Sequence, residues 1–425
     1  MKKTFLLSCL MLAAMPVMAA YTGHVYVDKN KNGVFDQSEK PLAGIKVSDG
    51  LNVVETAADG SFTLPGHERE RFIFITTPSG YKTFNRHYHK IEKKQSGYDF
   101  GLIPYSGRIR KDGSHRYIHI TDTEIFNTEN HADWVNNVHD YARNEQAAFI
   151  IHTGDICYEK GLKAHIKLMN TENMDCPVFY CIGNHDLVKG KYGEELFESI
   201  YGPVYYSFDA GNVHYVVTPM PGGDHAPGYT SDDVCRWLKN DLAHIRPGTP
   251  VVVFNHDLLT YEDTFIFKSK NAGSINLNEY NLKAWVYGHW HINYMKKQGD
   301  VYSVCTSSLD KGGIDHSTTA FRVMHVDSKG DFTSELRYTY LDKNICIASP
   351  AGVMASGVLP VAVNVYSSVS PVREVLYTCL ADGKPVLKNK RLLQSTDWSW
   401  NGELPLSHKY VGKELTLRVT ARFNN

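Results

Sequence analysis

The chain has 425 residues, 42% of them hydrophobic and 21% charged, and its net charge at pH 7 is −1. The length allows two to four domains, and the balanced charge argues against nucleic acid as the main substrate. Seven of the eight cysteines lie after the first twenty residues. An odd number cannot all pair, so a disulfide scaffold is not the basis of this fold.

Residues 1–20 have the pattern of a secretory signal peptide. Two lysines precede an apolar stretch from Phe5 to Met18, and the small residues Ala19 and Ala20 follow. The stretch is too short to span a bilayer stably, and we expect no later transmembrane segment. The sequence therefore predicts an exported protein, either periplasmic or extracellular.

Residues 21–104 are predicted to form a small β-sandwich domain. Short β-rich segments alternate with Gly and Asp-Gly turns, a pattern typical of an all-β domain. The segments are His24–Val27, Ala43–Ser48, Asn52–Thr56, Ser61–Leu64 and Arg71–Thr76.

Residues 28–39 fit the twelve-residue calcium loop. Oxygen-bearing side chains stand at positions 1, 3, 5, 9 and 12, with glycine at position 6 and a backbone carbonyl at position 7. The candidate ligands are Asp28, Asn30, Asn32, Val34, Asp36 and Glu39. The flanks are strands, so the segment resembles the calcium loops of bacterial surface β-domains and predicts a structural calcium ion. The alternative is an Asn/Gly-rich hairpin without an ion.

Residues 105–345 are predicted to form an α/β domain. Apolar residues recur at helical spacing around Trp134–Ala142, Leu162–Met169 and Val234–Leu242. Tyr205–Phe208 and Val213–Thr218 read as a hairpin. Because later strands arrive by hairpins, we expect two packed sheets instead of one doubly wound sheet. Residues 346–425 return to alternating β segments and predict a second small β-sandwich.

Polar motifs follow five strand-forming runs of the α/β domain. In open α/β sheets, ligands bind beyond the carboxyl ends of the strands. Strand after strand ending in Asp, Asn and His therefore predicts one cluster of metal ligands. The runs are Tyr117–Thr121, Ala148–Thr153, Val178–Ile182, Val251–Phe254 and Ala284–Tyr287, and the candidate ligands after them are Asp122, Glu124, Asp155, Asn184, His256, His289 and His291.

The spacing of these residues indicates two ions. Asp155 can give one oxygen to each, while Asp122, Glu124 and His291 complete one sphere, and Asn184, His256 and His289 the other. Two divalent ions about 3.5–4 Å apart clamp a phosphoryl group and hold a bridging hydroxide for in-line attack. His185 and Asp186 are the candidate catalytic residues: His185, backed by Asp186, is expected to protonate the leaving oxygen.

These motifs resemble those of the calcineurin-like metallophosphoesterases: Gly-Asp at Asp155, Gly-Asn-His-Asp at 183–186, the strand-end His256 and Gly-His-x-His at 288–291. The resemblance covers about residues 105–325. It implies a four-layer α/β/β/α fold, two ions such as Mn, Fe, Zn or Mg, and phosphoester hydrolysis. The order of segments also resembles a bacterial exported subgroup with a β-domain on each side.

The first motif departs from the family pattern. It reads Asp122-Thr123-Glu124, where the family usually has Asp-x-His. An oxygen ligand in place of imidazole favours Mn, Mg or Fe(III) over Zn. The alternative is that Glu124 does not bind metal and that the first ion is held loosely.

Candidate substrate-binding residues follow the strand Val301–Cys305. Glycines at 312 and 313 allow close approach of a ligand to the backbone, and Lys311, Asp315 and His316 lie around them. An ordinary turn with a solvated lysine is the alternative.

The sequence as a whole predicts an exported phosphoesterase with two metal ions. We expect phosphate mono- or diesters that are small or linked to glycans or the cell envelope. One alternative is a nuclease or cyclic-nucleotide phosphodiesterase. Another is a surface binding protein whose altered first motif marks impaired catalysis.

Overall fold

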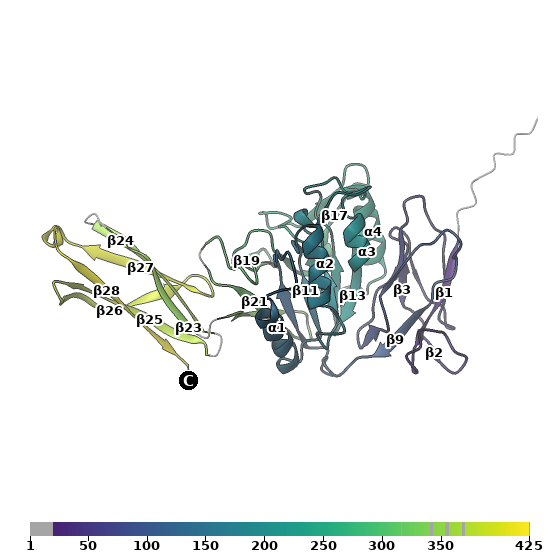
Figure 1. The fold of residues 1–425 in the computed structure, drawn as a ribbon, viewed down its shortest axis with the longest axis horizontal. Coiled ribbons are helices and arrows are strands. Elements are labelled where there is room, and N and C mark those ends of the chain that lie inside the picture. Colours follow the sequence, from purple (N-terminus) through teal and green to yellow (C-terminus); the bar gives the residue numbers. More distant parts are fainter. Residues whose placement is uncertain (1–19, 316, 341–342, 353–356, 368–369, 425) are drawn as a thin grey trace, which may run out of the picture.

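The computed structural model describes residues 20–424 except 316, 341–342, 353–356 and 368–369. Three regions follow one another along the long axis of the molecule, in chain order (Figure 1). A central domain with helices lies between two domains built from strands, which confirms the predicted fold class. The predicted signal peptide lies outside the described residues except for Ala20.

The N-terminal domain is a sandwich of two sheets around one core. One sheet has the order β2-β1-β9-β7, with β5 also paired to β1, and the other has the order β4-β3-β6-β8. Between them lie buried side chains such as Val25, Phe62 and Ile73. The strands are β1 (Tyr21–Val27), β2 (Lys40–Pro41), β3 (Lys46–Ser48), β4 (Val53–Glu55), β5 (Ser61–Leu64), β6 (Phe72–Ile75), β7 (Tyr81–Thr83), β8 (Tyr88–Lys90) and β9 (Phe100–Pro104).

The central domain contains the two packed sheets that the sequence predicted. The first has the order β12-β11-β10-β21-β22 and the second β13-β14-β15-β18-β20-β19. Their strands are β10 (His115–Ile120), β11 (Phe149–His152), β12 (Val178–Tyr180), β13 (Tyr206–Ala210), β14 (Val213–Val217), β15 (Val251–Phe254), β18 (Leu282–Tyr287), β19 (Tyr294–Gln298), β20 (Val301–Cys305), β21 (Ala320–Val326) and β22 (Phe332–Tyr338). A separate hairpin joins β16 (Ile266–Lys268) to β17 (Ser274–Asn276).

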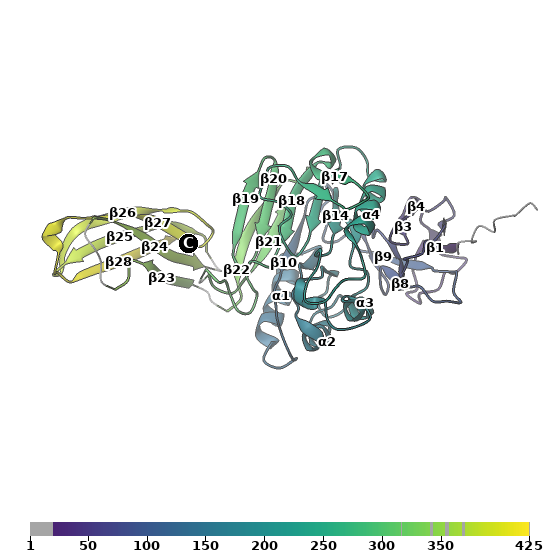
Figure 2. The same ribbon diagram turned by 90° about the horizontal axis from the view of Figure 1, so that it is seen from above.

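Helices cover the outer faces of both sheets, so the domain has four layers (Figure 2). The first sheet packs against buried residues of α1 (Ala132–Asn144), α2 (Tyr158–Leu168) and α3 (Glu195–Tyr201). The second packs against α4 (Ser231–Ala243) through Trp237, Leu238 and Leu242. The short 3-10 helix η1 (Asn184–Asp186) lies between β12 and α3, and η2 (Leu277–Tyr280) lies between β17 and β18.

Central parallel strands such as β11 and β15 are buried on both faces. This burial explains their continuous hydrophobic sequences.

Helix α4 begins with a capping box in which the Thr230 hydroxyl accepts the Asp233 N–H at 3.2 Å and the Asp233 carboxylate accepts the Thr230 N–H at 2.9 Å. The short helix α3 and the β16–β17 hairpin were not predicted.

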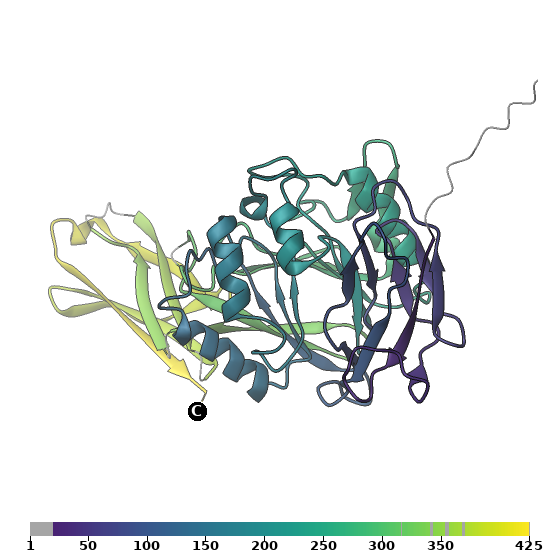
Figure 3. The same cartoon turned by 45° about the vertical axis from the view of Figure 1, so that its right-hand side comes forward.

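The N-terminal domain packs closely against the central domain (Figure 3). Thr77 forms a parallel bridge with Phe208 of β13, and Arg71 donates to Glu194 at 2.7 Å. Deeper in the interface, Lys46 Nζ lies 3.9 Å from Asp209 Oδ2, and the Thr76 hydroxyl lies 2.8 Å from the Ser207 hydroxyl. These polar contacts are buried or half-buried, so they tie the two domains into one frame.

The C-terminal domain is a six-stranded sheet of order β23-β24-β27-β26-β25-β28 that encloses its own core. Its strands are β23 (Lys343–Ser349), β24 (Gly357–Ser367), β25 (Val372–Ala381), β26 (Lys384–Gln394), β27 (Ser399–Leu406) and β28 (Leu415–Phe423), with η3 (His408–Tyr410) between the last two. Because β23 pairs with β24, this sheet begins at Lys343, slightly before the predicted boundary at residue 346. The buried Arg322 of the central domain donates to Asp397 at 2.9 Å across the junction.

All seven cysteines of the described residues are free thiols, and all but Cys346 are buried. This agrees with a fold that does not depend on disulfides. Among the described residues, every helix is too short or too polar to cross a membrane.

Candidate metal centre

The structure brings the seven predicted ligands to one edge of the two sheets. Asp122 and Glu124 follow β10, Asp155 follows β11, and Asn184 begins η1 after β12. From the second sheet, His256 follows β15, and His289 and His291 follow β18. Both sheets therefore contribute to the cluster, each at the carboxyl ends of parallel strands.

Five of these residues have a left-handed backbone. The φ angles are 50° at Asp122, 44° at Glu124, 55° at Asp155, 63° at His289 and 49° at His291. Residues other than glycine rarely adopt this region, at a cost of about 1–2 kcal/mol each. Such strain persists only where the surrounding fold imposes it, and it is concentrated at functional sites.

Glycines in the motifs permit close packing of the ligand loops. A Cβ built on Gly183 would lie 2.2 Å from Asp155 Oδ1, and one built on Gly288 would lie 1.9 Å from Thr121 Oγ1 and 2.5 Å from Asp122 Oδ2. Any side chain at these two positions would displace a predicted ligand. The motif glycines are therefore required by close approach between loops.

The first group of ligands surrounds Asp122. His291 Nε2 lies 3.2 Å from Asp122 Oδ1 and 3.4 Å from Glu124 Oε1. The other oxygen of Asp122, Oδ2, accepts hydrogen bonds from the Thr121 hydroxyl at 2.6 Å and the His289 N–H at 3.1 Å. One carboxylate oxygen is thus fixed by the fold, and the other faces the remaining ligands.

The second group surrounds Asp155 and His256. The Nδ1 of His256 lies 2.7 Å from the Thr153 carbonyl oxygen, so this nitrogen carries the proton and donates. The other ring nitrogen, Nε2, faces the cluster and lies 3.1 Å from Asp155 Oδ2. Ligand atoms of Asp155, His256 and His289 lie within 4.8 Å of one another, close enough to hold one ion.

Three buried polar atoms of this cluster have no hydrogen-bond partner among the described residues. They are Asp122 Oδ1, Asn184 Oδ1 and His256 Nε2. Buried polar atoms in native proteins are almost always paired, so such an exception requires an explanation. All three belong to residues predicted as ligands, and each would gain a partner from a bound cation. The residues present fit a metal centre.

The predicted pairing of His185 with Asp186 is wrong. Asp186 is fully buried, and its carboxylate accepts backbone N–H groups from Asp155 at 3.0 Å, Cys157 at 2.8 Å and Gly183 at 2.9 Å. Successive residues of η1 point in different directions, so Asp186 faces into the fold. Its role is to fix the two loops that carry ligands.

Asp224 is the partner of His185. Its Oδ2 lies 2.8 Å from His185 Nδ1, and its own N–H donates to the Asn184 carbonyl at 3.1 Å. Burial alone would lower the pKa of His185, but the hydrogen bond to Asp224 and the charge of Asp155 outweigh it, and the pKa is raised. Asp224 was not predicted, because its Gly-Gly-Asp sequence signals only a turn.

The candidate substrate-binding residues have separate positions. Lys311 forms an ion pair with Glu124 Oε2, so it neutralises this carboxylate at the edge of the metal cluster. Asp315 accepts the Ser317 N–H at 3.0 Å within its own turn. His316 lies outside the described residues.

The predicted calcium loop closes on itself around Asp28. This buried carboxylate accepts the N–H groups of Asn32 at 3.1 Å and Gly33 at 3.0 Å. The Glu39 carboxylate accepts the N–H of Lys29 at 2.9 Å and that of Asp36 at 3.2 Å. The first and last predicted ligands thus shape the loop, and calcium binding stays a prediction.

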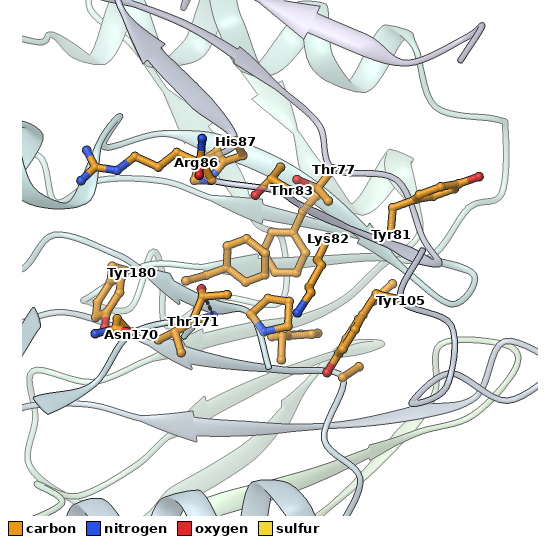
Figure 4. A pocket seen from close by; sticks show the side chains of 18 of the residues that line it. Thr77, Tyr81, Lys82, Thr83, Arg86, His87, Tyr105, Asn170, Thr171 and Tyr180 are labelled. Carbon is orange, nitrogen blue, oxygen red and sulfur yellow. Dashed lines mark hydrogen bonds between the residues drawn. The ribbon is translucent and has the colours of Figure 1, made fainter. Parts of the chain in front are cut away.

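A cavity of about 320 Å³ lies between the N-terminal and central domains (Figure 4). Thr77 and Lys82 line it from one side, and Asn170 from the other. Phe149 and Val178 also line it, and they are the first residues of β11 and β12. The cavity is therefore at the end of these strands opposite to the metal ligands.

Comparison with known protein families finds two matches in this chain. Residues 115–293 match the family model of the calcineurin-like phosphoesterases, and residues 29–104 match the model of the N-terminal region of calcineurin-like phosphoesterases. Together the two matches cover more than half of the chain. The chain therefore belongs to the calcineurin-like phosphoesterases.

A curated relative is purple acid phosphatase 13 of Arabidopsis thaliana, with 26% identity over 215 residues, which are 47% of this chain and 36% of the relative. The chain thus spans about a third of that relative. Among solved structures, an archaeal phosphodiesterase has 13% identity and a TM-score of 0.27, over 52% of this chain and 99% of its own. Vacuolar protein sorting 29 from Cryptosporidium parvum has 11% identity and a TM-score of 0.29, over 66% and 99%.

Proposed function

We propose that the chain hydrolyses phosphate esters at a centre of two metal ions. The observation that carries this proposal is the set of three buried, unpartnered polar atoms that converge among carboxylates and imidazoles. When bound, two divalent ions clamp a phosphoryl group, polarise its oxygens and lower the pKa of water so that hydroxide attacks in line.

The ligand distances support a division into two groups. Atoms that bind one ion at about 2.1 Å lie roughly 3.0–3.4 Å from one another. His291 lies at such distances from Asp122 and Glu124, and His256 lies at such a distance from Asp155. We assign Asp122, Glu124 and His291 to one ion, Asn184, His256 and His289 to the other, and Asp155 to both.

His185 is the proposed proton donor to the leaving oxygen. Its side chain is 34% exposed at the edge of the cluster, and Asp224 fixes the ring through Nδ1. The other nitrogen, Nε2, is then free to donate. A water molecule gives its hydroxyl group to phosphorus and one proton to solvent, the bond from phosphorus to the alcohol oxygen breaks, and a proton from Nε2 converts that oxygen into a hydroxyl group. A proton from solvent then restores His185.

Glu124 determines which metals the first group prefers. As an oxygen ligand it favours Mn, Mg or Fe(III) over Zn, and the ion pair with Lys311 leaves its second oxygen available. Metal analysis of Glu124→Ala tests this assignment. We expect one of two manganese ions to be lost on dialysis. Retention of both ions with unchanged affinity would show that Glu124 is not a ligand.

Turnover of p-nitrophenyl phosphate and bis-p-nitrophenyl phosphate with manganese tests the activity and separates monoesterase from diesterase. Asp155→Asn removes the shared ligand and should reduce kcat/KM at least about 100-fold. The matched control is Asp300→Asn, at a fully exposed carboxylate. If the parent protein with both ions loaded turns over neither substrate, the hydrolase proposal is wrong and a binding role is favoured.

Export and calcium binding complete the proposal. The signal-like sequence of residues 1–20 supports a periplasmic or extracellular protein that acts on small, glycan-linked or envelope-linked phosphoesters. Sequencing the N-terminus of the mature protein should show a start at Ala20 or Tyr21.

For calcium, the melting temperature should rise when calcium is added while the catalytic metals stay loaded, and Asp36→Ala should abolish that rise.

A further inference from the structure

Two exposed aromatic rings stand beside the metal centre. Phe126 is 54% exposed and Tyr158 is 43% exposed, and their rings stack with centroids 6.2 Å apart and an interplanar angle of 16°. Phe126 comes two residues after Glu124, and Tyr158 three residues after Asp155. The pair therefore sits on the two loops that carry ligands of the first group.

Exposed apolar side chains are common when scattered singly, but here their positions are not scattered. Four aromatic side chains are strongly exposed in the part of the chain that the structure describes: Phe126, Tyr158, Tyr261 and Tyr340. Three of them lie close to predicted metal ligands. Phe126 and Tyr158 follow Glu124 and Asp155 in the sequence. Tyr261 stacks on Trp290, which stands between His289 and His291, with ring centroids 5.8 Å apart. The rim of the metal centre is thus unusually aromatic.

The fold holds Tyr158 in this exposed position. Cys157 and Tyr158 both have positive φ angles, of 75° and 56°, and the Cys157 N–H donates to the buried Asp186 carboxylate at 2.8 Å. Two consecutive strained residues anchored by a buried carboxylate are a costly way to begin helix α2. The arrangement is understandable if the presented ring has a function.

The position of His185 indicates what the rings contact. Its ring centroid lies 5.3 Å from that of Tyr158, and under the proposed function His185 gives its proton to the leaving oxygen. The alcohol bound through that oxygen must therefore extend over Tyr158 and Phe126. Lys311, with Nζ 5.9 Å from the Phe126 centroid, closes the far side of the ring pair.

We propose that Phe126 and Tyr158 form a stacking platform that selects phosphate esters whose leaving alcohol carries a ring with an apolar face. Both an aromatic ring and a pyranose ring offer such a face to an aromatic side chain. The inference rests on the proposed function for the direction of the leaving group. It adds a substrate class that the metal ligands alone do not specify.

The test compares ring-bearing and ring-free esters. The substrates are 2-naphthyl phosphate, glucose 1-phosphate and glycerol 3-phosphate, and the main variant is Phe126→Ala, with metal content measured for each protein. Loss of one stacking partner is expected to reduce the kcat/KM ratio of a ring ester to glycerol 3-phosphate about tenfold. Comparing this ratio between the variant and the parent protein cancels the intrinsic reactivity of each leaving group. Phe126→Trp keeps an aromatic face, so its kcat/KM ratio of ring ester to glycerol 3-phosphate should be close to the parent value.

Tyr261→Ala is the control, because it removes another exposed aromatic ring, one that stacks on Trp290 and not on the Phe126–Tyr158 pair. It should leave the ratio within twofold of the parent value. If Phe126→Ala lowers only the ratio for 2-naphthyl phosphate, the platform binds aromatic alcohols. If it lowers the ratios for both ring esters, the platform binds pyranose rings as well. The platform is refuted if Phe126→Ala leaves both ratios unchanged, or if Tyr261→Ala lowers them equally.

Binding without turnover separates this inference from the proposed function. Titration calorimetry with naphthyl phosphonate should show about tenfold weaker affinity for Phe126→Ala than for the parent, with methylphosphonate as the ring-free reference. If the parent binds naphthyl phosphonate about tenfold more tightly than Phe126→Ala does but hydrolyses no ester, the hydrolase proposal fails and the platform stands. If it hydrolyses esters but binds both phosphonates equally, the platform fails alone.

Discussion

Replacing Gly183 with alanine tests whether the close packing of the ligand loops supports the metal centre. The added Cβ would lie 2.2 Å from Asp155 Oδ1 and 2.3 Å from Asp155 N, whereas real Cβ contacts essentially never fall below 3.0 Å. The carboxylate or its loop must therefore move by at least about 0.8 Å. Displacements near 1 Å at a reacting centre cost about 100-fold in rate, and overpacking of this kind costs about 1–3 kcal/mol in stability.

We expect Gly183→Ala to lower kcat/KM by about 100-fold and to reduce retention of both ions, because Asp155 is assigned to both. Steady-state kinetics and metal analysis after dialysis measure the two effects. Gly222→Ala is the control, since its Cβ would meet no atom within 4 Å. If Gly183→Ala keeps both ions and more than a third of the parental kcat/KM, the geometric reasoning about this motif fails.

Three further predictions concern stability and the surroundings of the site. Burial alone would lower the pKa of His214, but the Asp241 carboxylate raises it more, and the net shift is upward. The charged ring therefore stabilises the fold at low pH, and this contribution is lost as pH rises through the raised pKa. The excess melting temperature of the parent over His214→Gln should thus shrink from pH 6 to pH 9, and a constant or growing excess would contradict the pKa assignment. Asp397→Ala removes the carboxylate that pairs with the buried Arg322 and should cost about 1.5–3 kcal/mol of unfolding free energy; an unchanged urea midpoint would argue against a tight junction. Asp186→Asn offers one acceptor and two donors where three backbone N–H groups point, so both metal content and melting temperature should fall, and normal values of both would show that the carboxylate is dispensable.

The metal cluster could be predicted because its parts are encoded locally. Parallel strands that are buried on both faces read as continuous hydrophobic runs, as in Val251–Phe254, which is both the predicted and the observed strand. Each ligand follows such a run directly, so its place at the sheet edge follows from the strand alone. The two-sheet arrangement was equally predictable from the hairpin of β13 and β14.

The contacts around His185 could not be predicted in the same way. Sequence neighbours suggested Asp186 as its partner, but the η1 turn aims that carboxylate at three backbone N–H groups. The true partner, Asp224, arrives on a loop 39 residues away, and its position depends on how that loop packs over η1. Helix α3 was missed because seven residues make only about two turns, which give a weak periodic signal.

The ligands extend from Asp122 to His291 and come from the ends of strands in two different sheets. No partial chain that stops before His291 contains both proposed coordination spheres, and neither sheet alone provides one complete set. Under the proposed assignment, both ions can be captured only after the second sheet has docked on the first. Retained metal in a purified sample would consequently report that the entire central domain has assembled.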